Sequence, residues 1–536
     1  MDNINVVIVG GGSAGWITAG WLIKKNKNIN VSVIESPAIP KIGVGESVTP
    51  EVANFFIELG VPESEWMGKT GAVYKLANKF TNWKNGRGES QYFSFNYPTD
   101  SKLLYRDISQ ATSMKDWFLD SNTQSKTSDL MLYMFNNKMV DNFDQSFNSQ
   151  HHYMEKNVAP FDSKDYLLNP LYSWSQHINA ELTAEYIRDN IAVPNGVTHL
   201  SAKILSVNKN NNKITSVVLE DGTIIAGDVF VDCSGMHKVL IKELDWNTIL
   251  YKDNPIDRAW VCQVDYTDQK TEMVNYSQTI AQPHGWMFKI TLYHRMGVGY
   301  CFSSSHISEE DALAHYKAQI ANNPRRFEPR LIRWTPSRLE CAAKDNVAAI
   351  GLSFGFVEPM EANALFTIIS SVGQLSLALS DYQQTGVLDF KNYNERITYG
   401  MDDIADFAKV HYSLSQRSDT EFWNDMRTIG QRENHTDLVY NKYTHTNHTM
   451  QKSIDGYTLF PDYMWAQLAM SWGIDTSKWF TSPDATTVAL AKLYFTYQEQ
   501  KHSIVSSTRQ NNYQWLKEHM FNNLSSKEWE QQYING

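Results

Sequence analysis

The hydrophobic pattern is clearest in the first part of the chain. A β-branched apolar run at 5–9 predicts a parallel strand that is buried on both faces. Apolar positions at helical spacing predict a helix over 16–25, and a second run at 30–35 predicts another strand, which ends in an acid. Strand, helix and strand in this order form a βαβ unit, which indicates an α/β fold with a parallel sheet.

The later apolar runs predict further elements of both kinds. In chain order we expect a helix over 175–189, a strand over 197–200, an antiparallel meander over 203–219 and a buried strand over 228–232. A β-rich platform over 258–305, another buried strand over 347–351 and helices over 363–382 and 398–410 follow. The remainder of the chain is expected to be mostly helical. The segment from about 80 to 165 is polar, aromatic and rich in asparagine, which favours an insertion or lid over a linker.

Glycines at 10, 12 and 15 lie between the first strand and the first helix, in Gly10-Gly11-Gly12-Ser13-Ala14-Gly15. They allow a tight turn in which the backbone approaches a pyrophosphate, and the following helix offers free N–H groups and the positive end of its dipole. Glu35, at the end of the second strand, can accept hydrogen bonds from a ribose. The combination predicts a dinucleotide site, with an ordinary glycine-rich turn as the alternative.

These elements together predict the fold class. By themselves they predict an α/β protein with a Rossmann-type domain of either the FAD or the NAD type. With the family resemblance described below, we expect a Rossmann-type FAD-binding domain of the two-dinucleotide-motif flavoprotein kind, a β-sheet platform and a mostly helical C-terminal part. The expected FAD-binding domain is discontinuous and covers 1–80, 170–240 and 340–400. The other expected units are an insertion or lid over 81–169, the platform over 241–339 and a helical C-terminal subdomain over 401–536.

Composition excludes several classes of protein. A hydrophobic fraction of 42%, with 16 Trp, 27 Tyr and 24 Phe, can form a large core and argues against a disordered chain. A net charge of −11 argues against nucleic acid as a partner. The 4 cysteines lack the spacing of a disulfide scaffold or a zinc site, and no metal is expected. We expect a soluble, cytoplasmic protein with no membrane segment and no signal peptide.

Several motifs, in order, resemble those of the flavin-dependent halogenases, the group typified by tryptophan halogenases. The resemblance covers roughly 1–80, 170–305 and 340–425. It rests on the glycine motif ending in Trp16, Ile42-Gly43-Val44-Gly45-Glu46-Ser47, Gly71-Ala72-Val73-Tyr74-Lys75 with Lys79-Phe80-Thr81-Asn82-Trp83, Phe230-Val231-Asp232-Cys233-Ser234-Gly235-Met236, Gly285-Trp286-Met287-Phe288-Lys289-Ile290 and Ile350-Gly351-Leu352-Ser353 through Glu358-Pro359-Met360-Glu361. It continues with Phe407, His411-Tyr412 and Phe422-Trp423.

The resemblance implies that the flavin cofactor and the protein side chains perform different steps of the reaction. FAD, delivered in reduced form by a separate flavin reductase, acts with O₂ as co-substrate to convert chloride, bromide or iodide into hypohalous acid. This species passes through a tunnel to Lys75, which holds it as a haloamine or by a hydrogen bond, while Glu361 assists halogen transfer. From the residues alone, a surface role for Lys75 and a structural role for Glu361 stay open. Lys79 is the competing lysine, and Glu358 is expected to be structural.

The resemblance also implies the remaining site residues. A halide site is expected at the backbone of Asn363 and Ala364, and an aromatic pocket and barrier at Phe93, Phe95, Trp286 and Phe288. Cofactor contacts are expected from Gly10, Gly11, Gly12, Ser13, Ala14, Gly15, Glu35, Ser36, Glu46, Ser47, Ile204, Asp232, Leu352 and Leu365.

Departures from the family pattern bear on specificity. Ala362-Asn363-Ala364 stands where better-known members have Ser-Thr-Gly, which puts the shape of the halide site in question and favours bromide or iodide as a hypothesis. Phe288 replaces a tryptophan and Thr291 a proline in the Trp-x-Trp-x-Ile-Pro signature. Phe93 replaces a histidine, and the grip on an amino acid backbone has no match around 455–472. The predicted substrate is therefore an indole, phenol or other electron-rich (hetero)aromatic ring, not free tryptophan.

Three alternatives remain at this point. An FAD-dependent aromatic monooxygenase would share the dinucleotide motifs but would not need Lys75. A flavoprotein without enzymatic activity would explain the altered residues after Glu361. An NAD-dependent dehydrogenase is disfavoured by Asp232 and by the segment at 42–47. The sequence leaves a homo-oligomer open.

Overall fold

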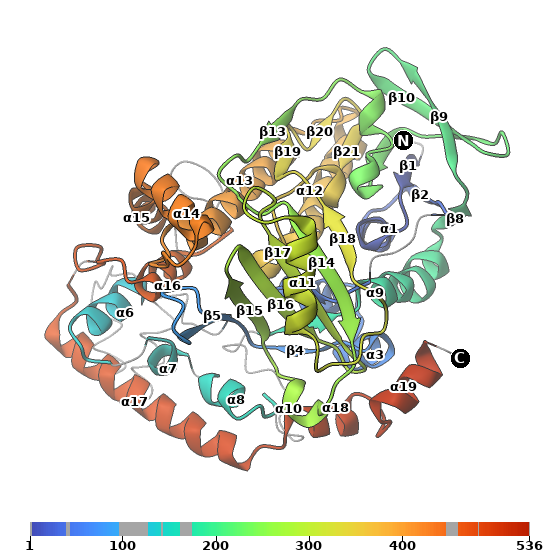
Figure 1. The fold of residues 1–536 in the computed structure, drawn as a ribbon. Helices are drawn as coiled ribbons and strands as arrows, with labels where there is room; N and C mark the ends of the chain where they lie inside the picture. The colour runs from blue at the N-terminus through green and yellow to red at the C-terminus, as the bar shows by residue number, and fades with distance from the viewer. Residues whose placement is uncertain are drawn as a thin grey trace.

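A mostly parallel sheet gathers strands from widely separated parts of the chain (Figure 1). The computed structural model describes residues 3–38, 43–95, 127–140, 143–148, 150–160, 174–445, 459–480 and 482–534. The strands of this sheet are, in order across it, β20 (Ala343–Lys344), β21 (Val347–Ala349), β12 (Val229–Asp232), β1 (Ile4–Val9), β2 (Ile29–Glu35) and β8 (Thr198–Ser201). The strands expected near 5, 30, 228 and 347 are therefore neighbours, which confirms the predicted Rossmann-type α/β core.

Helices cover this sheet. α1 (Ser13–Lys25) connects β1 to β2 and packs against α9 (Ala180–Ile187) and α12 (Asn363–Thr385). α12 is, within the described ranges, the helix long and apolar enough to cross a membrane by length and composition. Its apolar face packs on α1 and on α13 (Lys391–Ser413), so it is a core helix of this fold.

A second sheet forms the platform beside the first. Its strands are, in order across the sheet, β18 (Arg330–Arg333), β14 (Arg258–Val264), β17 (Met296–Phe302), β16 (Gly285–Thr291), β15 (Ser277–Gln282), β5 (Ala77–Thr81) and β6 (Ser90–Ser94). The β-rich platform expected over 258–305 is confirmed. β5 and β6 add to it from the N-terminal third of the chain, because β5 pairs in parallel with β15. This pairing places the segment after Lys75 against the platform.

A small sheet, β3-β7-β4, corrects one prediction. The helix expected from about 175 begins later, since Ser175–Ile178 is strand β7, paired with β3 (Glu46–Ser47) and β4 (Val73–Lys75). The Asn179 side chain accepts hydrogen bonds from the Glu181 and Leu182 N–H groups and thereby starts α9. Polar residues in β7 have buried partners, so the strand lacks the apolar alternation that reveals strands in a sequence.

Further short strands complete the β structure. The expected meander is present as β9 (Ile204–Asn210), β10 (Lys213–Leu219) and β11 (Ile224–Ala226). A separate sheet contains β13 (Thr248–Leu250), β19 (Ser337–Leu339) and β22 (Gly355–Phe356).

The C-terminal part is helical, as expected. α17 (Ala485–Thr508) runs along the outer edge of the molecule beside α7 (Phe143–Phe147) and α8 (His151–Glu155) of the predicted insertion (Figure 1). Residues 96–126, 141–142, 149 and 161–169 of that insertion lie outside the described residues. The insertion also contains α6 (Thr127–Asn136). The C-terminal part also contains α14 (Glu421–Arg432), α15 (His435–His445), α16 (Asp462–Trp472), α18 (Asn512–His519) and α19 (Ser526–Tyr533).

Candidate active site

The glycine motif forms an open cradle at the start of α1. A Cβ atom at Gly10 would lie 2.3 Å from the Cys233 carbonyl oxygen, and one at Gly15 would lie 1.9 Å from the Gly10 carbonyl oxygen. A Cβ atom at Gly12 would meet nothing within 4 Å. The α1 N-terminus has no side-chain cap and no acid in its first turn. Its N–H groups and positive dipole end therefore face an open space that fits the pyrophosphate of FAD.

Glu35 lies beside this cradle, at the end of β2. A Cβ atom at Gly11 would lie 2.3 Å from the Glu35 carboxyl carbon, so a larger residue at this position would require the Glu35 side chain to move. Glu35 Oε2 is 3.1 Å from His199 Nε2, and Ala202 N–H donates to the Glu35 carbonyl oxygen. Ser36 follows directly, and Ile204 begins β9 just after Ala202. The structure thus brings Glu35, Ser36 and Ile204 to one edge of the sheet.

Asp232, a predicted cofactor contact, is buried and hydrogen-bonded within the protein. Its Oδ1 accepts hydrogen bonds from Ser234 N, Ser234 Oγ and Ser353 Oγ at 3.0, 2.6 and 2.9 Å. Its Oδ2 accepts from the Leu240 and Ile241 N–H groups at 2.8 and 3.1 Å. The buried carboxylate is saturated by protein donors. Asp232 therefore fixes the turns after β12 and β21, both of which face the cradle.

Leu352 and Leu365 lie on the other side of the cradle. A Cβ atom at Gly351 would lie 3.2 Å from Ala14 Cβ, so the turn after β21 packs on the start of α1. Leu352 is exposed in this turn, whereas Leu365 is buried on α12. The start of α12 and the glycine motif are thus held close together.

Glu46 and Ser47 form β3, and the Ser47 hydroxyl is used inside the protein. Ser47 Oγ is 2.7 Å from Ser277 Oγ, which is 2.8 Å from His177 Nε2, while His177 Nδ1 is 3.0 Å from Thr291 Oγ1. Burial and the charge of Lys75 lower the pKa of His177 to about 3, so this histidine is neutral. Burial raises the pKa of Glu46 to about 7. The network fixes the segment at 43–47 against the platform.

Lys75 is fully buried at the end of β4, which excludes a surface role. Its Nζ donates to the Val48 carbonyl oxygen at 3.0 Å and lies 4.8 Å from the centre of the Phe95 ring. Burial lowers the pKa of Lys75 to about 7, and the nearby charge of Glu361 acts in the opposite direction. An amine and an ammonium are therefore both available near neutral pH.

Glu361 projects from a strained turn before α12. Glu361 and Ala362 both have positive φ, 62° and 60°, which is unfavourable for residues other than glycine. The Glu361 side chain is 5% exposed. Its Oε2 accepts a hydrogen bond from Asn78 Nδ2 at 2.9 Å, and its Oε1 lies 3.2 Å from His411 Nε2. The turn thus directs the carboxylate into the buried region that also contains Lys75.

The predicted aromatic pocket divides into two parts. Phe95 lies over Lys75, whereas Phe93 is buried against Phe80 and Trp472, with ring centroids 4.9 and 5.8 Å away. Phe93 is opposite Asn78 in the β5–β6 register, so it lies on the face that holds Glu361.

Lys79 Nζ, of the competing lysine, lies 3.8 Å from Glu155 and over the Tyr92 ring. Trp465 and Trp472 are fully buried core residues.

Trp286 and Phe288 extend from β16, with ring centroids 6.0 Å apart. The Phe288 ring fills the space that a side chain at Gly299 would need. Trp286 Nε1 donates to Glu358 Oε2 at 3.0 Å, and the Tyr412 hydroxyl donates to the same oxygen at 2.6 Å. Burial raises the pKa of Glu358 to about 7. Glu358 is thus the centre of a buried network that includes the predicted barrier.

Asn363 and Ala364 begin α12 and line a cavity of ≈ 50 Å³. Leu352, Glu358, Thr367 and Met401 line the same cavity. The two predicted halide residues therefore lie together, next to Glu358 and to the turn that contains Leu352.

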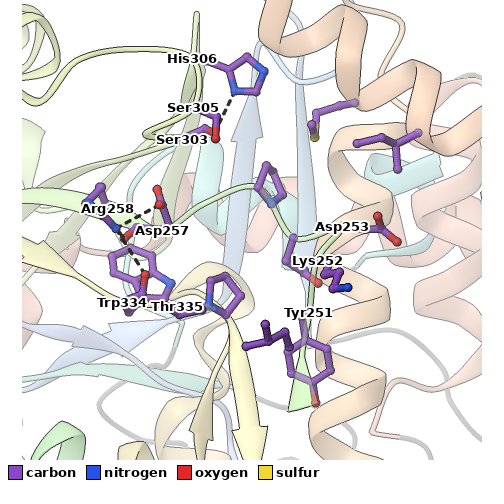
Figure 2. A pocket seen from close by; sticks show the side chains of 16 residues that line it. Tyr251, Lys252, Asp253, Asp257, Arg258, Ser303, Ser305, His306, Trp334 and Thr335 are labelled. Carbon is purple, nitrogen blue, oxygen red and sulfur yellow. Dashed lines mark hydrogen bonds and ion pairs between the residues drawn. The ribbon is translucent and has the colours of Figure 1, made fainter. Parts of the chain in front are cut away.

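A larger cavity of ≈ 450 Å³ is separate from these residues (Figure 2). Arg258 donates to Asp257, and His306 bonds to Ser303, so several of its polar groups are already paired. Trp334 lines this cavity and donates through Nε1 to the Val357 carbonyl oxygen at 2.7 Å. The larger cavity thus adjoins the loop before Glu358 but contains none of the predicted site residues.

Sequence reasoning gave no role to Asn78, His411 or Tyr412. The hydrogen bond to Glu361 joins residues far apart in the chain, so spacing could not reveal Asn78. His411 and Tyr412 fall in the motif set of the resemblance, which was the available signal. Adjacent positions on α13 direct them to different carboxylates, His411 to Glu361 and Tyr412 to Glu358.

Comparison with known proteins identifies the family of this chain. The family described as tryptophan halogenase matches residues 5–487. The tryptophan 7-halogenase RebH of Lentzea aerocolonigenes is 30% identical over 430 residues, 78% of each chain. The tryptophan 6-halogenase SttH of Streptomyces toxytricini has a solved structure with a TM-score of 0.79 and 26% identity, over 96% of this chain and 99% of that one.

The fold is also that of Xcc4156, a flavin-dependent halogenase from Xanthomonas campestris, with a TM-score of 0.82 and 23% identity over 97% of this chain and 99% of that one. The chain therefore belongs to the tryptophan halogenase family, as an FAD-dependent halogenase that uses reduced FAD, O₂ and a halide ion.

Proposed function

We propose that this enzyme halogenates an electron-rich aromatic or heteroaromatic ring, such as an indole or a phenol, through Lys75 and Glu361. The observation that carries the proposal is the buried environment shared by these two side chains. Lys75 has no exposed surface and a pKa near 7, and the charge of Glu361 acts on it. A lysine and a carboxylate in this state can hold an electrophilic halogen and accept a proton.

The transfer can be written for these residues. Reduced FAD, when bound, supplies with O₂ the oxidising power that converts halide into hypohalous acid. The ammonium form of Lys75 donates a hydrogen bond to hypohalous acid. The amine form displaces water from it, giving an N–halogen bond. Halogen then passes from the nitrogen to the ring carbon, so the N–halogen bond breaks as the carbon–halogen bond forms. Glu361 accepts the proton that this carbon releases and returns it to the Lys75 nitrogen, which regenerates the amine.

The cofactor assignment follows from the cradle. We assign the pyrophosphate to residues 10–15, the ribose to Glu35 and the flavin ring to the region between Glu46 and Leu352. The open space at Gly12 supports the first of these assignments. Asp232 then acts by fixing the turns that border the cofactor, because its carboxylate is already saturated.

The substrate assignment rests on the aromatic residues near Lys75. Phe95 lies next to the amine, and Trp286 and Phe288 form a separate aromatic pair on β16. We assign Phe95 to direct substrate contact and Phe93 to its support. RebH and SttH act, by their names, on tryptophan. Here a histidine of the tryptophan-specific members is replaced by Phe93, which supports a flat substrate other than free tryptophan.

The proposal includes a partner and a location. A separate flavin reductase supplies the reduced cofactor, and the enzyme is soluble and cytoplasmic. The packing of α12 against α1 and α13 supports a soluble protein.

Mass spectrometry of the product tests the proposed function. Purified enzyme, FAD, a flavin reductase and O₂ are incubated with a panel of indoles, phenols and tryptophan in the presence of bromide. Replacement of hydrogen by bromine on an indole or a phenol is expected. Addition of one oxygen atom would favour an aromatic monooxygenase, and preference for free tryptophan would contradict the assigned pocket.

A further inference from the structure

The two oxygen atoms of Glu358 have different environments. The residue is 5% exposed. Oε2 accepts hydrogen bonds from Trp286 Nε1 and from the Tyr412 hydroxyl, at 3.0 and 2.6 Å. Oε1 is buried and has no hydrogen-bond partner among the residues that the structure describes. One oxygen is therefore satisfied, while the other lacks the partner that a buried polar atom normally has.

This asymmetry decides where a proton on Glu358 would lie. An oxygen that accepts two hydrogen bonds serves as the carbonyl oxygen of a carboxylic acid, so the O–H group is on Oε1. Burial raises the pKa of Glu358 to about 7, and the acid form is therefore well populated at neutral pH. Its O–H would be a buried donor without an acceptor.

The titratable groups that face Glu358 do not compensate its charge. Tyr412 faces it from α13 and Cys301 from β17, and the pKa values of both groups are raised well above their usual range by burial and by Glu358 itself. Both groups are therefore neutral near pH 7. Among the described residues no cation forms an ion pair with Glu358, so an ionised Glu358 would carry a buried charge without a cationic partner.

A second donor without an acceptor lies at the same cavity. Asn363 Nδ2 is buried and, within the described part of the chain, has no hydrogen-bond partner. Asn363 and Glu358 both line the ≈ 50 Å³ cavity at the N-terminus of α12, a helix of 23 residues. Amide, carboxylic acid and helix N-terminus all favour an acceptor that carries negative charge.

We propose that protonated Glu358 is a ligand of the halide ion in this cavity, so that the enzyme takes up one proton when halide binds. The inference rests on the proposed halide site at Asn363 and Ala364 and adds its regulation by pH. The ionised carboxylate repels the halide, whereas the acid donates a hydrogen bond to it. Glu358 is thereby a specificity-determining residue for anions, in addition to its contacts with Trp286 and Tyr412.

Bromide binding to the FAD-free enzyme tests this inference. Titration calorimetry with sodium bromide in chloride-free buffers of different ionisation enthalpy measures the affinity and the number of protons taken up. In the wild type, we expect uptake approaching one proton per bromide above pH 7, and a roughly tenfold loss of affinity for each further pH unit. Bromide binding that is absent, or independent of pH, would overturn the inference.

Two variants identify the carboxyl group. Glu358→Gln keeps a donor at the position of Oε1, so bromide should bind with little dependence on pH. Glu361→Gln, three residues away, should retain the dependence of the wild type. Loss of the dependence in E361Q and its retention in E358Q would overturn the assignment. If E358Q does not fold, infrared difference spectra of the wild type should show growth of a protonated carboxyl band when bromide is added, and no growth would contradict the inference.

The same titration with FAD bound separates halide from the flavin as the acceptor. If proton uptake accompanies FAD binding and bromide binding causes none, Glu358 donates to the flavin and the inference is wrong. Failure of the proton linkage leaves the product assay unaffected, because that assay reads ring halogenation. The two proposals can therefore fail separately.

Discussion

His411 Nε2 and Glu361 Oε1 lie 3.2 Å apart in the interior of the site. The other ring nitrogen, Nδ1, is 2.7 Å from the Phe407 carbonyl oxygen, which can only accept a hydrogen bond. Nδ1 therefore carries a hydrogen, and a neutral His411 would present the lone pair of Nε2 to the carboxylate. The contact is attractive only when one of the two groups carries a proton. His411 and Glu361 thus form a buried pair in the region that contains Lys75.

This pair predicts the effect of substitutions at His411. His411→Phe removes the ring nitrogen that contacts Glu361 but keeps a planar ring among Phe80, Phe407 and Trp472. We expect halogenation to fall by about 10²-fold, the lower range for general acid–base groups, and its pH profile to shift. FAD affinity should be unchanged.

His411→Gln should restore part of the activity, because its amide can donate to Glu361 Oε1. Equal activity of wild type and H411F, with identical pH profiles, would show that the pair has no part in transfer.

Stability should depend on pH in two opposite ways. The pKa of Glu46 is raised to about 7 in the folded protein, so the contribution of this group is largest at low pH and is lost as pH rises from about 4.5 to 7. The pKa of Lys75 is lowered to about 7, so the unfolded chain binds more protons between about pH 7 and 10.5, and stability rises with pH in that window. Thermal unfolding in a pH series measures both trends.

Single variants separate the two contributions to the pH dependence. Glu46→Gln should reduce the slope of the curve below pH 7, where Glu358 contributes in the same direction. Lys75→Met should reduce the slope above pH 7 and stabilise the protein at pH 7. A curve that is unchanged in both variants would contradict the assigned causes. Lys79→Met, a lysine with partial exposure, is the matched control and should leave the upper window unchanged.

The strained turn before α12 predicts a stabilising change. Ala362 has φ 60° and ψ 31°, a conformation that glycine adopts without steric conflict. Ala362→Gly should raise the free energy of unfolding by about 1 kcal/mol, measured by urea denaturation. If A362G is destabilised to a similar extent, contacts of the buried Ala362 methyl group outweigh the strain.

The altered halide site predicts a preference among halides. With chloride, bromide and iodide at equal concentrations, brominated or iodinated product should exceed chlorinated product. The reason is that Ala362-Asn363-Ala364 replaces the Ser-Thr-Gly of better-known members, which changes the shape and polarity of the site. Competition assays read by mass spectrometry measure the ratio, and a clear preference for chloride would refute the hypothesis.

Local patterns were sufficient for much of the fold. The βαβ unit, the meander and the strands at 229–232 and 347–349 follow from apolar periodicity and glycines, which act within a few residues. β7 was missed because Ser175, Gln176 and His177 have buried hydrogen-bond partners from distant segments. The entry of β5 and β6 into the platform likewise depends on pairing between residues about 200 positions apart, such as Phe80 and Thr279.

Site residues could be predicted from the sequence where they belong to a motif of the family resemblance. Lys75 and Glu361 came from the family resemblance, and burial of Lys75 then distinguished it from Lys79. The partners of these residues had no such signal. Asn78 and His411 contact Glu361 only through the fold, and the saturation of Asp232 by backbone donors depends on two turns that meet in space.

The central claim is that Lys75 carries halogen to the substrate ring. The most direct measurement compares the products of the wild type, Lys75→Ala and Lys79→Ala with an indole substrate, bromide and reduced FAD, alongside FAD binding and peroxide release. The account predicts that K75A loses bromination by at least about 10²-fold while it binds FAD and releases peroxide, and that K79A keeps bromination. Bromination by K75A at the rate of the wild type would contradict it.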